Sequence, residues 1–257
     1  MYSQERMVNF RWISRITATY SPYTLTHADI ASADLALELS ELGQFAETAY
    51  SALPTEFIFS NLALLMEADF PLEGYDALQG SVLVSAIHGK VADVGAYVAY
   101  RPSSKQLFVA ISGTSNFWQT LQDLRTVKHK HPVGRGCAVH SGFWKMYNGI
   151  RPEVFSAIEK GLRDHKVSEL VLTGHSLGGA LSYLLAIDLL LPVGLELLLG
   201  LPLKVAVFGS PRCGNTQMSR LWLELAEQYR TKNGKESLKE YSVKGYNDGK
   251  VANLNPK

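Results

Sequence analysis

The residue with the clearest chemical potential is Ser176, which stands in the pattern Gly174-His175-Ser176-Leu177-Gly178. A Gly-x-Ser-x-Gly pattern between a strand and a helix places the serine on a tight turn that exposes its hydroxyl. Small residues two positions before and after the serine let the strand and the helix pass close together. The N-terminus of the following helix would favour negative charge that develops on a substrate. We therefore predict that Ser176 is a nucleophile for acyl transfer.

The sequence around this motif separates that interpretation from an ordinary glycine-rich turn with a helix-capping serine. An apolar run precedes the motif at 170–173, and a helical pattern follows it at 177–191, as the nucleophile motif requires. His175 is not expected to be the base, because a neighbour on the same turn cannot easily present its ring to the Ser176 hydroxyl. We predict instead that Gly174, His175 and Gly178 form the elbow that carries the nucleophile.

A second turn of small residues, Ser112-Gly113-Thr114, follows the apolar stretch 108–111. Alone, such a turn is an ordinary strand end. Beside a nucleophilic serine, it can direct a backbone N–H at the oxyanion of a tetrahedral intermediate. The second donor would be the backbone N–H of Leu177, directly after the nucleophile.

The segment 115–124 has a helical pattern that opens with Asn116, Phe117 and Trp118. Its aromatic side chains suit a lid over an apolar acyl-binding site. They also suit a surface helix that packs on the domain through its own tryptophan and leucine side chains. The sequence leaves both interpretations open.

The elements that would position these residues follow an α/β pattern. Three strand-like runs come first and are expected to pair antiparallel at one side of a sheet, since turn signals separate them. Helices and strands then alternate, which predicts a mostly parallel central sheet. The early strands are expected at 81–87, 94–100 and 106–111, the later ones at 169–173, 204–208 and 238–246, and the helices at 141–165, 177–191 and 215–229. Nearer the N-terminus, Thr26 and Asp29 at capping spacing predict the start of a further helix.

Length and composition narrow the possible classes of protein. The chain has 257 residues, which suits a single domain over 1–257, and its net charge of +1 offers no large basic surface for nucleic acid. The two cysteines, Cys137 and Cys213, make no disulfide framework, and no metal or cofactor motif is present.

The longest apolar stretch, 181–203, is interrupted by polar residues and by proline, so a buried helix plus a loop is expected rather than a transmembrane span. The N-terminus lacks the apolar core of a signal peptide, which predicts an intracellular, cytoplasmic protein.

Several motifs in the same order resemble those of the class 3, fungal-type lipases. They are 111–114 (Ile-Ser-Gly-Thr), 139–143 (Val-His-Ser-Gly-Phe), 174–180 (Gly-His-Ser-Leu-Gly-Gly-Ala), 208–215 (Phe-Gly-Ser-Pro-Arg-Cys-Gly-Asn) and 246–249 (Tyr-Asn-Asp-Gly). The resemblance implies an α/β-hydrolase fold and hydrolysis of carboxylic esters, typically acylglycerols. By motif position it implies that Ser176 is the nucleophile, that Asp248 orients a catalytic histidine, and that Thr114 and Leu177 supply the oxyanion hole. It also implies a lid at 115–124.

The histidines depart from the family's pattern. The triad of an α/β-hydrolase follows the chain order serine, acid, histidine, yet all seven histidines of this chain precede Ser176. None follows Asp248, and the residues 250–257 do not resemble the family's continuation, so we expect that the C-terminal part of the domain is missing. Because a serine hydroxyl without a base is a poor nucleophile, we expect little activity unless an upstream histidine such as His140 reaches Ser176.

Three interpretations of function follow from these observations. The first is an esterase that acts on lipid esters, with transient contact to a lipid surface. The second is a module of the same fold that binds acyl lipids without catalysis, because the histidine is absent. The third is an acyltransferase or a peptidase built on the same elbow, which the sequence does not exclude. A histidine near Ser176 would favour the enzyme over the binding module.

Overall fold

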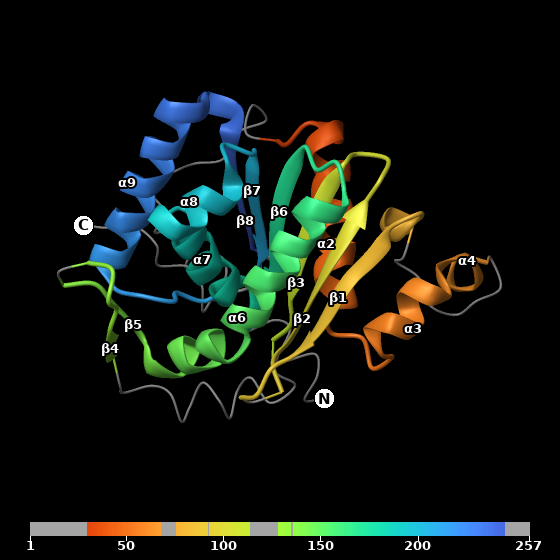
Figure 1. Cartoon of the computed structure of the whole chain (residues 1–257), viewed down its shortest axis with the longest axis horizontal. Coiled ribbons are helices and arrows are strands. Elements are labelled where there is room, and N and C mark those ends of the chain that lie inside the picture. Colours follow the sequence, from red (N-terminus) through yellow and green to blue (C-terminus); the bar gives the residue numbers. More distant parts are fainter. Residues whose placement is uncertain (1–29, 68–75, 92, 114–127, 135, 245–257) are drawn as a thin grey trace, which may run out of the picture.

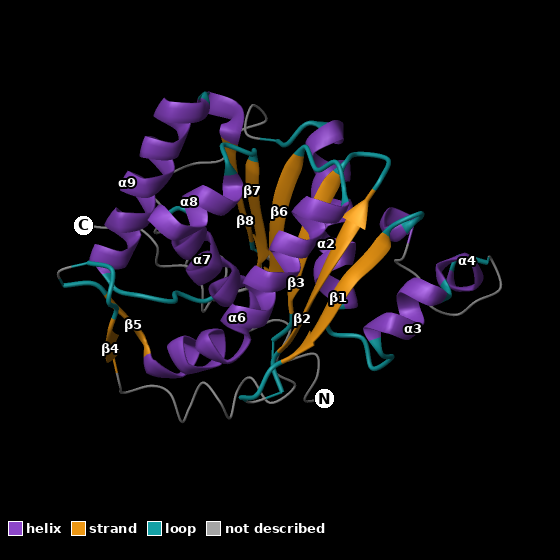
Figure 2. Ribbon diagram, in the orientation of Figure 1, coloured by secondary structure: helices purple, strands orange, loops and turns teal. Residues whose placement is uncertain are grey.

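The computed structural model describes residues 30–67, 76–91, 93–113, 128–134 and 136–244. Its centre is a sheet in the order β1-β2-β3-β6-β7-β8 (Figures 1 and 2). The strands β1, β2 and β3 pair antiparallel, and β3, β6, β7 and β8 pair parallel. This confirms the predicted α/β-hydrolase sheet. The strands are β1 (Val82–His88), β2 (Gly95–Arg101), β3 (Gln106–Ile111), β6 (Glu169–His175), β7 (Leu203–Phe208) and β8 (Leu238–Val243).

Helices cover both faces of this sheet (Figure 1). One face carries α6 (Ser141–Asp164), α7 (Leu177–Leu189), α8 (Pro192–Leu198) and α9 (Thr216–Asn233), and the other carries α2 (Ala33–Thr48). The side chains of β3 alternate between the two layers, as a strand period of two requires. Leu107, Val109 and Ile111 belong to the core beneath α6 and α7. Phe108 belongs to the core beneath α2, where its ring stacks on Phe45 with centroids 3.7 Å apart.

The predicted capping residues Thr26 and Asp29 lie outside the described residues. Helix α2 begins at Ala33, and its N-cap is Ser32, whose Oγ accepts from the Leu35 N–H at 3.2 Å. One detail of the predicted helices is wrong. The apolar stretch after Leu181 forms two helices rather than a helix and a loop. Pro192 begins α8, which is bent by 89° from α7, because proline suits the first turn of a helix and not its interior.

Several short elements were not predicted from the sequence. They are α3 (Thr55–Ser60), α4 (Leu62–Leu65), a 3-10 turn at Asp76–Leu78, a second at Lys235–Ser237, and the antiparallel pair β4 (Lys128–Lys130) and β5 (Ala138–His140). Elements of three to six residues lack the length in which periodicity becomes visible. Within the described residues no single helix is long and apolar enough to cross a membrane, and only the bent pair α7–α8 passes that test by length and composition.

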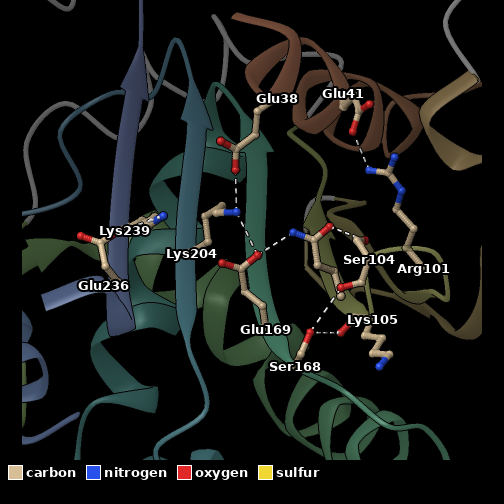
Figure 3. Close-up of polar contacts among 11 residues, drawn as sticks. Glu38, Glu41, Arg101, Ser104, Lys105, Ser168, Glu169, Lys204, Glu236 and Lys239 are labelled. Atoms are coloured by element: carbon tan, nitrogen blue, oxygen red, sulfur yellow. Dashed lines mark hydrogen bonds and ion pairs between the residues drawn. The ribbon is translucent and has the colours of Figure 1, made fainter. Parts of the chain in front are cut away.

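A network of charged side chains joins α2 to the strand ends opposite the predicted nucleophile (Figure 3). The ammonium of Lys204 on β7, whose side chain is 6 % exposed, lies 2.6 Å from a Glu38 oxygen on α2 and 2.9 Å from a Glu169 oxygen on β6. Burial lowers the pKa of Lys204, but its hydrogen bonds to Glu38 and Glu169 outweigh burial, so the pKa is raised overall. Lys204 therefore bridges two carboxylates and joins α2 to the sheet.

Replacement of this buried cation is expected to destabilise the fold. Lys204→Met should lower the free energy of unfolding by about 3 kcal/mol, since two partly buried carboxylates lose their counter-charge. Urea denaturation followed by circular dichroism measures the change. The control is Lys239→Met, whose ion pair with Glu236 is largely exposed and should contribute less than about 1 kcal/mol. Equal effects of the two substitutions would contradict this role of Lys204.

Candidate active site

Ser176 occupies the turn between β6 and α7, as the sequence motif predicts. It is the residue before the first helical residue of α7, and its backbone has φ 53° and ψ −122°. A positive φ is unfavourable for a residue with a side chain and persists only where the surroundings enforce it. The Ser176 N–H donates to the Phe208 carbonyl at 2.8 Å, which ties the turn to the end of β7. The serine therefore sits in a conformation that the fold imposes.

The two flanking glycines are required by close packing of the backbone. A Cβ at Gly174 would lie 2.6 Å from the carbonyl carbon of Gly178, and a Cβ at Gly178 would overlap the carbonyl oxygen of Ile111. Strand β6, helix α7 and the end of β3 thus meet at this point. This explains the predicted glycine spacing by direct contact.

The end of β3 lies beside the elbow because β3 and β6 are parallel neighbours. Ser112, which follows β3, fixes this end: its N–H donates to the Gly95 carbonyl at 2.9 Å, and its hydroxyl accepts from the Gly95 N–H at 2.8 Å. The turn that was expected to form one side of the oxyanion hole therefore begins next to Ser176. Leu177 is the first residue of α7, where backbone N–H groups have no partner within the helix.

Tyr50, just after α2, was not identified from the sequence and lies at this site. Its hydroxyl donates to the carbonyl of His175, and a Cβ at Gly113 would overlap the same hydroxyl. Burial raises the pKa of Tyr50 to about 12, although a hydrogen bond from the Gly113 backbone lowers it. One phenol therefore joins the ends of β3 and β6 on either side of the predicted oxyanion hole. No local pattern marks this tyrosine, because its partners are far away in the sequence.

Removal of this hydroxyl is expected to affect both stability and any Ser176-dependent reaction. Tyr50→Phe should lower the free energy of unfolding by about 1 kcal/mol and the rate of ester hydrolysis about tenfold, because the elbow and the oxyanion turn lose a shared support. The matched control is Tyr229→Phe, whose hydroxyl donates to the Leu201 carbonyl at 2.6 Å. That variant should lose similar stability and no activity. A Tyr50→Phe protein with an unchanged rate would contradict this assignment.

The described histidines do not complete a triad. Within the part of the chain that the structure describes, none of their rings hydrogen-bonds to the Ser176 hydroxyl. The His175 ring packs edge-on against Tyr50, with centroids 5.5 Å apart, which agrees with a structural role in the elbow. His140 is half-buried at the end of β5, and its N–H donates to the Cys213 carbonyl at 2.9 Å. His140 is the last residue of β5 and the N-cap residue of α6.

His131, after β4, is 4 % exposed. Its Nδ1 accepts from the Val133 N–H at 3.3 Å, so protonation there would break a hydrogen bond. Burial lowers its pKa, Asp188 opposes this change, and His129 adds to it.

Because the folded pKa of His131 lies below the unfolded value of about 6.5, the unfolded chain binds more protons, and stability should fall as the pH drops below about 6.5. Urea unfolding at pH 7.5 and pH 5 measures this, and His131→Phe should reduce the loss. A loss of the same size in the variant would exclude His131 as its source.

The remaining predicted residues lie outside the described part of the chain. They are Thr114, the lid candidates Asn116, Phe117 and Trp118, and Asp248. Strand β8, which precedes Asp248 in the sequence, runs parallel to β7 and ends at Val243, whose carbonyl accepts from the Gly209 N–H at 2.8 Å. The carboxyl ends of β6, β7 and β8 therefore lie at the same end of the sheet as Ser176.

Comparison with curated proteins gives relatives that are fungal lipases. One is the secreted mono- and diacylglycerol lipase 1 of Fusarium solani, 27 % identical over 135 residues, which covers 52 % of this chain and 38 % of that protein. Another is a lipase of Rhizomucor miehei, 29 % identical over 114 residues, which covers 44 % of this chain and 31 % of that protein. The matched stretch thus spans about a third of the length of these relatives.

Solved structures show the same fold. The lipase of Rhizopus microsporus var. chinensis superimposes with a TM-score of 0.65 at 20 % identity and covers 88 % of this chain and 71 % of its own. A triacylglycerol lipase whose catalytic centre is a serine protease triad superimposes with a TM-score of 0.60 at 22 % identity and covers 82 % and 72 % of the two chains.

The prediction of a cytoplasmic location is wrong. Relatives from Fusarium solani, Penicillium cyclopium, Malassezia globosa and Gibberella zeae are all named secreted lipases. The prediction rested on the first residues of the chain alone, and those do not define a compartment when the relatives are exported proteins.

The family of this chain is shown by a match that is much longer than any single motif. The model of the family described as lipase (class 3) matches residues 108–241, which include most of β3, the elbow at Ser176, and most of β8. That stretch is more than half of the chain. The protein therefore belongs to the class 3 lipase family.

Proposed function

We propose that this chain carries the site of a carboxylic ester hydrolase that acts on lipid esters such as acylglycerols, with Ser176 as the nucleophile. The observation that carries the proposal is the backbone of Ser176, held at φ 53° between β6 and α7. Strain of this kind is expected where a side chain must be presented to a substrate. The named substrates of the relatives, mono- and diacylglycerols, support the class of ester. The names of the secreted relatives support an extracellular site of action.

In the proposed reaction the Ser176 oxygen attacks the ester carbonyl and gives a tetrahedral intermediate. Its oxyanion would accept hydrogen bonds from the backbone N–H of Leu177, at the positive end of α7, and from that of Thr114. Collapse breaks the ester C–O bond, and the proton lost by the Ser176 hydroxyl passes to the leaving alcohol. Water then attacks the acyl-serine, which releases the acid and returns a proton to the serine oxygen. Tyr50 holds the two sides of this site together through His175 and Gly113. Asp248 is proposed as the acid that orients the base.

The direct test is hydrolysis of p-nitrophenyl butyrate by the purified chain beside Ser176→Ala, with and without added imidazole. Ser176-dependent release of the chromophore supports the ester hydrolase. Equal rates in the two proteins under every condition would leave the chain as a lipid-binding module. The second candidate function is binding of acyl lipids without catalysis by these 257 residues, in which every histidine precedes Ser176.

A further inference from the structure

A cavity of about 150 Å³ lies between α7, α9, β8 and the loop after β7. Its walls include the apolar side chains of Ile187, Met218 and Trp222, and its rim includes the exposed Arg212. An apolar cavity of about this size holds a molecule as large as benzene. Neither Ser176 nor Leu177 lines this cavity.

One wall of the cavity is the carboxylate of Glu240, which two aromatic side chains hold in place. The Tyr183 hydroxyl donates to Oε1 at 2.5 Å, and the Trp222 indole N–H donates to Oε2 at 2.9 Å. The two rings meet edge to face, with centroids 5.6 Å apart and an interplanar angle of 82°. The carboxylate is therefore fixed in a corner formed by two rings.

No ion pair matches the charge of this carboxylate within the part of the chain that the structure describes. Among the ion pairs of the described residues none includes Glu240, although the residue is only partly exposed. Arg212 lines the same cavity but forms no ion pair with it. Neutral donors orient a carboxylate without neutralising it, and a carboxylate shielded from water gains most from a positive partner.

We infer that this cavity binds an organic ammonium group of about the size of trimethylammonium. Glu240 supplies the counter-charge. Tyr183 and Trp222 supply aromatic surface, which attracts cations more strongly than aliphatic surface does. Ile187 and Met218 contact the methyl groups. The same chemistry occurs in a free choline-type compound and in the headgroup of a choline lipid. The inference does not depend on Ser176 and can therefore fail or succeed independently of the proposed ester hydrolysis.

The first test is calorimetric titration of the Ser176→Ala chain with choline chloride, with sodium chloride as the salt control. The comparison ligand is 3,3-dimethylbutan-1-ol, which has the shape of choline and no charge. Choline is expected to bind saturably and at least about tenfold more tightly than the neutral alcohol. Equal affinities would overturn the inference, because the cavity would then recognise shape alone. Absence of saturable binding by choline would also overturn it.

Two variants assign the binding to this cavity. Glu240→Gln should weaken choline at least about tenfold, whereas Glu227→Gln, which removes the same charge from the exposed face of α9, should change nothing. Ser242→Lys serves if Glu240→Gln does not fold, because Ser242 is exposed at the rim and a lysine there can place its own ammonium beside Glu240. That variant should also lose choline binding. Unchanged affinity in either folded variant would place the site elsewhere.

Binding to lipid vesicles distinguishes the two sources of the ammonium group, a lipid headgroup and a free choline-type compound. Phosphatidylcholine vesicles that bind the Ser176→Ala chain, and that free choline displaces, identify a lipid headgroup as the ligand. Choline binding without vesicle binding identifies a small soluble compound. Vesicles of phosphatidylglycerol are the control, and equal binding to both kinds of vesicle, without displacement by choline, would contradict recognition of the ammonium group.

Discussion

Imidazole is expected to increase ester hydrolysis by the wild-type chain about tenfold and to leave Ser176→Ala at the rate of imidazole alone. A positioned general base increases the rate by about 10² to 10⁴, and imidazole that diffuses to the site can supply a small part of this rate enhancement. The expectation follows from two observations. Ser176 is presented on the elbow at the end of β6, and all seven histidines precede it in the sequence, whereas the family's base follows its acid.

A second serine, which flanks the other end of the same strand, serves as the matched control. Ser168 is exposed just before β6, at the opposite end from Ser176, and its hydroxyl donates to the Lys105 carbonyl at 3.2 Å. Ser168→Ala should retain the full imidazole-dependent rate. Fast, Ser176-dependent hydrolysis without imidazole would mean that a residue of the chain acts as the base. Rates that do not depend on Ser176 would remove it from the reaction.

The parts of the fold that could be predicted are those determined by residues that are close together in the sequence. The elbow was predictable because its residues lie within a single strand–turn–helix unit, in which a Cβ at Gly174 would meet the backbone of Gly178. The parallel strands were predictable because continuous apolar runs alternate with helices of ten residues or more. Ends of elements were less accurate. The N-cap of α2 is Ser32, because capping depends on which serine, threonine or aspartate meets the first free N–H groups.

The parts that could not be predicted depend on contacts between distant segments. Tyr50 and His175 are separated by 125 positions, and nothing near Tyr50 indicates that its hydroxyl reaches the elbow. Glu240 is one charged residue in a strand, and its environment arises only when α7 and α9 bring Tyr183 and Trp222 against β8. Periodicity shows which face of an element is buried, but it does not show which partner that face meets.

Gly178→Ala should destabilise the chain by about 4 kcal/mol or more, an effect expected only where an added atom meets rigid backbone. The new Cβ would overlap the carbonyl oxygen of Ile111, the last residue of β3, and neither β3 nor α7 can move without disturbing the core between them. The control is Gly43→Ala in α2, whose Cβ would lie 3.6 Å from the Phe208 ring. Alanine is the better helix former, so this control should gain up to about 1 kcal/mol. Thermal unfolding of both variants measures the difference. A Gly178→Ala protein as stable as the wild type would mean that the close approach of β3 to the elbow is not required, and the explanation of the motif's glycines would then be wrong.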